Sequence, residues 1–397
     1  MTWPQRSRRP RLDPRTGLAL GGSAAIIVLA ALSVAPAWSM SALPVVLAAS
    51  ELAPATTFLA LLWLFAARVL LAGKRVWRTM ATVALLGAMV PGVRILVQAL
   101  GLANRIALDV LPDGAAGASA RTGILPSTLA GVPSAPDVRE RTIEYAAADG
   151  SPLAMRLFVA PPGRAPRPIV VVLYGGGWRA GDPGQGAAQN RALAGRGYLV
   201  AAIDYRHAPE FTYPAQLDDV RQSLTMIRDS AASWNGDPSR IALLGRSAGG
   251  HLAELAAFMP GAPPVRAVIA LYAPWNLADG YRDVPRPDPI GVRTVIGDFM
   301  GGAPDALPAR YEEASPSSYV RPGMPPTLLL YGARDHLVKP EFNRDATSAL
   351  WASNEHSVAI ELPWSEHGFD LVPGGLGARI AHATIVRFLD REMKARP

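Results

Sequence analysis

A serine flanked by closely spaced glycines is the side chain in this sequence best placed for nucleophilic chemistry. Ser247 is central to the segment Gly245-Arg246-Ser247-Ala248-Gly249-Gly250. Glycines two residues before and two after a serine permit a sharp strand-to-helix turn, which lifts the hydroxyl out of a sheet and sets it at a helix N-terminus. A glycine-rich turn with a solvent-exposed serine is the alternative. An apolar run at 241–244 before the turn and a helical pattern after it favour the nucleophile.

A nucleophilic serine requires a base and a residue that orients the base. Asp335 stands four residues beyond the apolar run at 327–331, and His367 follows the apolar run at 357–362. Both lie where predicted strands end, so Ser247, Asp335 and His367 are the expected catalytic residues. The remaining five histidines fit surface or packing roles: His207, His251, His336, His356 and His382.

Three glycines in succession follow another buried run, in Tyr174-Gly175-Gly176-Gly177-Trp178. Their amides can approach a ligand closely, as the stabilisation of an oxyanion requires. A plain loop or a phosphate cradle is the alternative, but the glycine spacing is wrong for a dinucleotide fingerprint.

The composition limits the remaining chemistry. The 397 residues include no cysteine, which rules out a thiolate nucleophile and any cysteine-ligated metal. No pair of histidines has zinc spacing with a third ligand, so we expect neither a metal nor a cofactor.

Alternating strands and helices must position these residues. Short runs rich in β-branched residues occur at 169–173, 199–203, 241–244, 267–271, 327–331 and 357–362. Apolar residues follow one another in these runs and do not alternate with polar ones. Such strands are expected where helices cover both faces of a parallel sheet. Helical patterns separate them, so residues 137–397 are predicted to form a doubly wound, mostly parallel α/β domain that opens with an antiparallel hairpin. Residues 274–320 are too long for an ordinary connection and predict a cap-like insertion. We expect Trp275 and the region 281–299 to line a substrate pocket.

The formal net charge of +7 belongs to the first quarter of the chain. Residues 1–110 hold 11 Lys/Arg and 3 Asp/Glu, whereas the remainder holds 28 basic and 29 acidic residues. The basic residues flank apolar runs and do not cluster on a folded surface, so nucleic acid is not an expected partner. Three runs at about 17–38, 53–72 and 80–103 are long enough to cross a bilayer, and we expect transmembrane helices within residues 17–104. The third contains Pro91 and Arg94, and a re-entrant or interfacial helix is its alternative.

Charge around these runs predicts their orientation. Residues 1–16 are rich in arginine, and Lys74, Arg75 and Arg78 lie between the second and third runs. Between the first and second runs the single charged residue is Glu51. The positive-inside rule then places residues 1–16 in the cytoplasm and, after three crossings, the α/β domain on the extracytoplasmic side of the cell membrane. A twin-arginine signal at 8–9 or signal-peptidase cleavage near 37 is the alternative, and neither changes that side. Residues 105–136, rich in Ala, Gly, Ser and Pro, are predicted to be a flexible tether.

The separated motifs together resemble the serine esterases of the α/β-hydrolase fold, in the hormone-sensitive-lipase-like group and its feruloyl-esterase-like relatives. The resemblance covers about residues 140–390 and rests on segments 174–178, 204–210, 236–241, 245–250, 314–316, 332–338 and 367–369. It implies hydrolysis of esters through an acyl-enzyme. Ser247 would be the nucleophile, His367 the base and then acid, and Asp335 the orienting residue. The amides of Gly176, Gly177 and Ala248 would form the oxyanion hole.

Two positions depart from the family pattern. Tyr174 replaces the histidine that usually precedes the glycine triplet and helps to hold that loop. Arg246 precedes the nucleophile where relatives often have Asp or His. For Arg246 we favour pairing with a neighbouring carboxylate over contact with an anionic substrate. Trp178, Arg246 and Trp275 are the candidate substrate-binding residues.

The sequence therefore predicts a membrane-anchored serine carboxylesterase acting on short-acyl or lipid-like esters. A peptidase or acyltransferase with the same three residues is the alternative within the fold. A catalytically silent receptor or binding protein is the alternative from another class, and it would be expected to lack one of the three.

Overall fold

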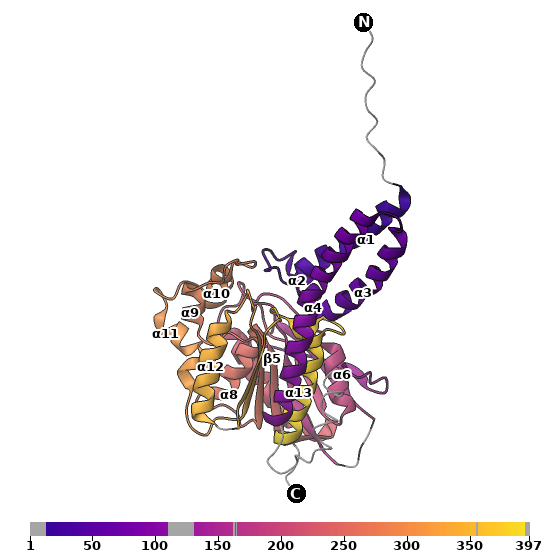
Figure 1. Cartoon of the computed structure of the whole chain (residues 1–397). Helices are drawn as coiled ribbons and strands as arrows, with labels where there is room; N and C mark the ends of the chain where they lie inside the picture. The colour runs from indigo at the N-terminus through magenta and orange to yellow at the C-terminus, as the bar shows by residue number, and fades with distance from the viewer. Residues whose placement is uncertain (1–12, 110–130, 162, 164, 355, 394–397) are drawn as a thin grey trace.

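The computed structural model describes residues 13–109, 131–161, 163, 165–354 and 356–393. Most of the predicted basic N-terminus (1–16) and most of the predicted tether (105–136) fall outside these residues. The described part forms an α/β domain from which a bundle of apolar helices projects (Figure 1).

One eight-stranded sheet, in the order β1-β2-β4-β3-β5-β6-β7-β8, forms the centre of the domain. The first two strands pair antiparallel, β2 pairs antiparallel with β4, and the remaining pairs are parallel. The strands are β1 (Arg139–Ala146), β2 (Pro152–Val159), β3 (Arg167–Leu173), β4 (Leu199–Ile203), β5 (Gly236–Arg246), β6 (Ala267–Leu271), β7 (Thr327–Gly332) and β8 (Val358–Leu362). The predicted hairpin and the mostly parallel sheet are confirmed.

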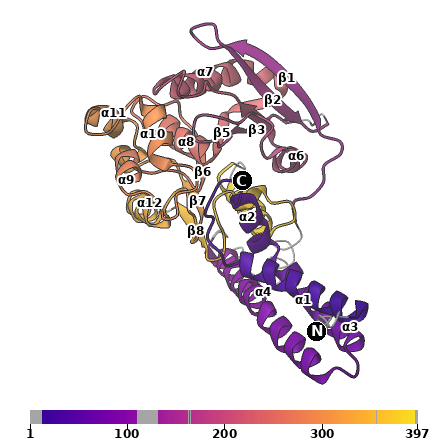
Figure 2. The ribbon, with the colours of Figure 1, turned by 90° about the horizontal axis from the view of Figure 1, so that it is seen from above.

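Helices cover both faces of the sheet, as continuous apolar strands require. Helices α7 (Ala215–Ser230), α8 (Ala248–Phe258) and α12 (Pro340–Ser353) lie on one face, and α6 (Ala187–Gly195) and α13 (Leu376–Met393) lie on the other (Figure 2). All residues of β4, β6 and β7 are buried, so the core includes both faces of the sheet at these strands.

The long connection between β6 and β7 folds over the carboxyl ends of the strands. It contains α9 (Leu277–Arg282), α10 (Val292–Met300), α11 (Pro308–Glu313) and the short helix η2 (Pro316–Tyr319). The predicted cap-like insertion at 274–320 lies within this connection.

The N-terminal region contains three helices that are long and apolar enough to cross a membrane: α1 (Pro14–Leu32), α3 (Ala53–Leu70) and α4 (Arg75–Asp109). Alanines lie between them, with Ala60, Ala67 and Ala88 buried in their contact, as close helix packing in lipid favours. Large apolar side chains face outward, including Phe58, Phe65, Val69 and Val83. A fourth helix, α2 (Leu43–Glu51), is short and was not expected from the sequence.

Helix α4 belongs to both parts of the molecule. Its buried residues Ile95, Ala99, Leu102 and Ile106 join the core of the α/β domain. Residues 75–94 precede that contact and have a helical length of about 30 Å, the thickness of a bilayer hydrocarbon core. Arg94 therefore lies where the helix meets the α/β domain, although in the sequence it falls inside the third apolar run. The helix continues through Pro91.

Candidate active site

Ser247 occupies the single position between β5 and α8. Its backbone angles, φ 50° and ψ −122°, are strained for a residue with a side chain and turn its hydroxyl away from the sheet. The helix that follows starts very close to β3, because a Cβ on Gly249 would lie 2.3 Å from the carbonyl oxygen of Tyr174. Only glycine allows this approach, which explains why the serine is flanked as it is.

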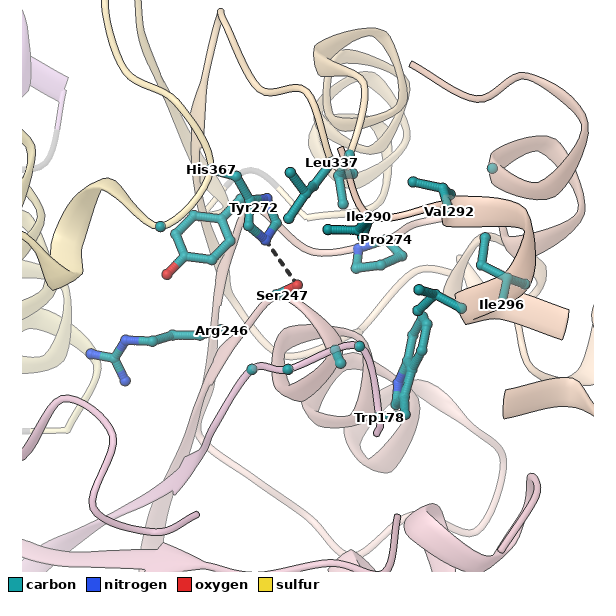
Figure 3. Close-up of a pocket in the computed structure, with 18 of the residues that line it drawn as sticks. Trp178, Arg246, Ser247, Tyr272, Pro274, Ile290, Val292, Ile296, Leu337 and His367 are labelled. Carbon is teal, nitrogen blue, oxygen red and sulfur yellow. Dashed lines mark hydrogen bonds between the residues drawn. The ribbon is translucent and has the colours of Figure 1, made fainter. Parts of the chain in front are cut away.

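His367 lies between Ser247 and Asp335, and Figure 3 shows its contact with the Ser247 hydroxyl. Its Nε2 lies 2.9 Å from Ser247 Oγ, and its Nδ1 lies 2.8 Å from Asp335 Oδ2. A carboxylate accepts a hydrogen bond, so Nδ1 carries the proton and Nε2 is free to accept the proton of the serine hydroxyl. The three residues predicted to act together are brought together.

Asp335 is held in place by its own loop. Its Oδ1 accepts the backbone N–H groups of Leu337 and Val338, each at 2.8 Å, while Oδ2 faces His367. The side chain is buried. These bonds fix the carboxylate in the orientation that the imidazole requires.

The glycine loop after β3 presents free amides to the serine. Among the described residues, no hydrogen-bond acceptor faces the N–H of Gly176, Gly177 or Ala248, and all three residues line the cavity at Ser247. Gly176 has φ +145°, and a Cβ there would lie 1.9 Å from the oxygen of Ala180. The loop geometry therefore depends on glycine, and its unpaired donors suit an oxyanion.

Tyr174 holds this loop at its base. Its hydroxyl donates to Asp204 Oδ1 at 2.5 Å and lies 2.8 Å from His207 Nε2. Tyr205 stacks on the Tyr174 ring at 4.4 Å and donates its own hydroxyl to the Tyr174 carbonyl. Burial and the neighbouring carboxylate raise the pKa of Tyr174, so the hydroxyl remains a donor. The position that departs from the family pattern thus still anchors the loop by hydrogen bonds.

A cavity of about 490 Å³ opens over Ser247. Apolar side chains from the cap and the glycine loop surround the hydroxyl in Figure 3, among them Trp178, Pro274, Ile290, Val292 and Ile296. Trp275 also lines the cavity. At the ends of the region 281–299, Tyr281 and Phe299 are not part of the wall; Phe299 instead stacks against Trp178 with ring centroids 4.3 Å apart.

Arg246 contributes to the cavity wall, but its guanidinium points away from Ser247 (Figure 3). Its Nε donates to Asp370 at 2.6 Å, and both side chains are almost fully buried. Asp370 also accepts the hydroxyl of Tyr272, whose ring lies 4.4 Å from that of His367. The arginine charge is neutralised within this cluster and is directed away from the substrate side.

The N-terminal region also reaches the site, which was not expected from the sequence. Met40, in the loop between α1 and α2, lines the cavity. The Arg334 guanidinium, next to Asp335, donates to the carbonyls of Ser33 and Ala35 at 2.7 Å each. Glu51, at the end of α2, contacts Ser365 near His367. The feature of the sequence that could have indicated this contact is Glu51, the single acidic residue between two apolar runs.

The remaining histidines lie outside the cavity. His251 is buried, and its Nε2 donates to the carbonyl of Ala314, while His336 pairs with Glu366. In the described part of the chain, no three His, Cys, Asp or Glu side chains gather as metal ligands would.

The chain is similar to known esterases. Residues 155–350 match the BD-FAE family model. Esterase LipC of Mycobacterium tuberculosis is 32% identical over 250 residues, which cover 58% of this chain and 60% of LipC. Carboxylesterase NlhH of the same species is 37% identical over 148 residues, 36% of this chain and 45% of NlhH. The chain thus spans less than two thirds of the length of these curated relatives.

Solved structures share the fold. Esterase 2 of Thermogutta terrifontis, phosphonylated by sarin, superposes with a TM-score of 0.55 at 23% identity, covering 66% of this chain and 99% of that one. The butyrate-bound form gives a TM-score of 0.53 at 24% identity, covering 67% and 98%. The α/β domain of this protein therefore has the α/β-hydrolase fold, and its sequence is similar to those of the esterases named above.

Proposed function

We propose that this protein is a membrane-anchored serine carboxylesterase. The observation that carries the proposal is the position of His367, within hydrogen-bond distance of both Ser247 Oγ and Asp335 Oδ2. The names of the curated relatives, esterase and carboxylesterase, support the same reaction.

Acylation starts at the serine hydroxyl. Ser247 Oγ attacks the ester carbonyl carbon while His367 Nε2 takes the hydroxyl proton, and Asp335 stabilises the imidazolium through Nδ1–H. The carbonyl oxygen becomes an oxyanion facing the N–H groups of Gly176, Gly177 and Ala248. Loss of one such donor typically costs about 3 kcal/mol of transition-state stabilisation.

Collapse of this intermediate expels the alcohol. His367 returns its proton to the leaving alkoxide, which leaves an acyl group on Ser247. Water then attacks the acyl-enzyme, with His367 accepting its proton, and the carboxylic acid is released as Ser247 is restored.

The helices α1, α3 and the first part of α4 support the proposed anchoring. Asp13 and Lys74 form an ion pair at the far end of this bundle, whereas Arg94 and Glu51 lie at the end next to the α/β domain. The bundle between them is outwardly apolar. In our proposal these helices cross the membrane three times, with the turn at Lys74 in the cytoplasm and the catalytic domain outside.

The substrate we propose is an uncharged, apolar ester, including lipid-like esters. The wall of the cavity is largely aliphatic and aromatic, and the charge of Arg246 is taken up by Asp370. Met40, at the cavity, and Trp38, two residues earlier, are more than half exposed on the segment that joins the membrane helices. Trp side chains favour the membrane interface, so the cavity would receive substrates that partition there.

Labelling with an organophosphonate tests the mechanism. Wild-type protein and Ser247→Ala, purified in detergent, are treated with a fluorophosphonate, and intact masses are measured. We expect one adduct on the wild type and none on the variant, together with hydrolysis of p-nitrophenyl esters by the wild type alone. Equal labelling of both proteins, or a folded wild type that neither reacts nor hydrolyses esters, would refute the proposal.

A further inference from the structure

Glu51 is a buried carboxyl group that the reaction above does not use. It ends α2 and is 1% exposed. Burying a carboxylate without donors is costly, so the partners of this side chain indicate what it stabilises.

Both partners of Glu51 belong to the segment that carries His367. The hydroxyl of Ser365, two residues before His367, donates to Oε1 at 2.6 Å, across 314 residues of sequence. The backbone N–H of Gly377, in the first turn of α13, donates to Oε2 at 2.5 Å. One carboxylate therefore holds the histidine loop on both sides of the imidazole.

The start of α13 is shaped around this carboxylate. A Cβ on Gly377 would lie 2.8 Å from Glu51 Oε2, and a Cβ on Gly375 would lie 3.0 Å from the Cβ of Glu51. Two glycines thus leave the space that Glu51 fills.

The loop that carries Asp335 is bound to the same part of the chain. Arg334 donates to the carbonyls of Ser33 and Ala35, just after the end of α1. The two loops that supply Asp335 and His367 therefore both rest on residues 33–51, which we call the anchor segment.

We propose that Glu51 is a positioning residue for His367, and that the anchor segment is thereby a working part of the active site. The proposal rests on the esterase function proposed above. Its physical basis is distance: His367 Nε2 must stay within hydrogen-bond reach of Ser247 Oγ, and a displacement of about 1 Å can cost about 100-fold in rate. In this view the apolar helices do more than attach the enzyme to a membrane.

Substitutions at Glu51 test the proposal through kcat. Glu51→Ala removes both hydrogen bonds and should lower kcat about 10- to 100-fold, with KM changed less than about threefold, because the cavity wall is untouched. Glu51→Gln should recover most of the rate, since its amide can accept from Gly377 and donate to Ser365. Asp13→Ala is the matched control, a carboxylate removed from the far end of the bundle, and should keep the wild-type kcat.

Thermal unfolding of each variant accompanies the kinetics, and Ser365→Ala repeats the test from the other partner if Glu51→Ala does not fold. A drop in kcat in folded Glu51→Ala or Ser365→Ala, with recovery in Glu51→Gln, supports the proposal. Wild-type kcat in a folded Glu51→Ala, or in folded Ser365→Ala where Glu51→Ala fails to fold, overturns it. The esterase proposal fails separately, because it would be refuted by activity in Ser247→Ala whatever happens at Glu51.

Discussion

The hydroxyl of Tyr174 lies 2.5 Å from Oδ1 of Asp204, and this contact ties the end of β3 to the end of β4 directly beneath the glycine loop. His207 Nε2 lies 2.8 Å from the same hydroxyl. The start of the loop is thus fixed by polar contacts, whereas the amides of Gly176 and Gly177 remain unpaired.

Removal of the Tyr174 hydroxyl should therefore weaken catalysis as well as folding. Tyr174→Phe keeps the ring that stacks on Tyr205, but it loses a hydrogen bond to a carboxylate, an interaction worth about 1.5–3 kcal/mol. We expect kcat/KM for a p-nitrophenyl ester to fall about 10-fold. Tyr198→Phe removes an equivalent bond to Asp390 and is the control. Equal losses in the two variants would contradict a role for Tyr174 in the loop.

A side chain at Gly176 should disable the oxyanion site. In Gly176→Ala the new Cβ would meet the oxygen of Ala180 at 1.9 Å, so the loop must move and its amides with it. We expect kcat to fall about 100-fold or more while labelling of Ser247 slows in parallel. Gly101→Ala, where a Cβ meets open space in α4, should behave as wild type. A fully active Gly176→Ala would show that other donors serve the oxyanion.

A charge at Met40 should distinguish long from short acyl chains. Met40→Asp places a carboxylate at the apolar cavity and should raise KM for long-chain esters about 10-fold while leaving acetate esters nearly unchanged. Val45→Asp, an exposed change on the same segment that does not line the cavity, is the control. The same KM ratio in both variants would mean that Met40 does not contact the acyl group.

The absence of cysteine makes the membrane topology directly testable. Ala72→Cys places one thiol in the turn before α4, and Ala352→Cys places one at an exposed position near the end of α12. With a membrane-impermeant maleimide on intact spheroplasts, we expect labelling at 352 and none at 72 until the cells are lysed. The reverse pattern would put the catalytic domain in the cytoplasm.

Two buried histidines should make the fold sensitive to acid. Burial lowers the pKa of His251 and of His382 to about 4, from an ordinary 6.5. Between pH 6.5 and 4 these histidines are protonated in the unfolded chain but remain neutral in the folded protein. Their contribution to the free energy of unfolding is therefore fully present above pH 6.5 and is lost as the pH falls toward 4. Each group contributes up to about 3 kcal/mol over that range.

Thermal unfolding in detergent at pH 7.5, 6 and 5 measures this loss. His251→Gln and His382→Gln should each flatten the dependence of the unfolding temperature on pH. His356→Gln, at an exposed position, is the control. If all three variants follow the wild-type curve, other groups govern acid stability.

Sequence patterns located the strands of the sheet because β4, β6 and β7 are buried on both faces and are therefore continuously apolar. Local spacing also marked Ser247, since the glycines around it are required by the turn itself. Asp335 and His367 were found from their places after such strands, which the fold brings to one edge.

The end of α4 shows why other features could not be predicted. Ile95 and Ile106 pack against the α/β core, yet a lipid-facing helix would have the same composition, so hydropathy cannot separate the two environments. Helix α2 is short, and its apolar residues have no clear periodicity. The sequence therefore does not indicate where this helix begins or ends. Glu51 was noticed only as a charge, because its partners lie more than 300 residues further along the chain.

If the apolar helices cross a membrane as proposed, the continuity of α4 from the bundle into the domain core fixes the distance of the catalytic site from the bilayer. A hydrolase on a flexible linker would sample many orientations relative to the membrane. Because α4 is shared by the helix bundle and the α/β domain, the cavity has little freedom to tilt or to move away from the bilayer. Under the proposed anchoring, the catalytic centre meets its substrates in a thin layer beside the bilayer. Its rate should then follow the number of ester molecules per unit of membrane area, so that diluting a substrate with inert lipid slows turnover even when its total amount is unchanged.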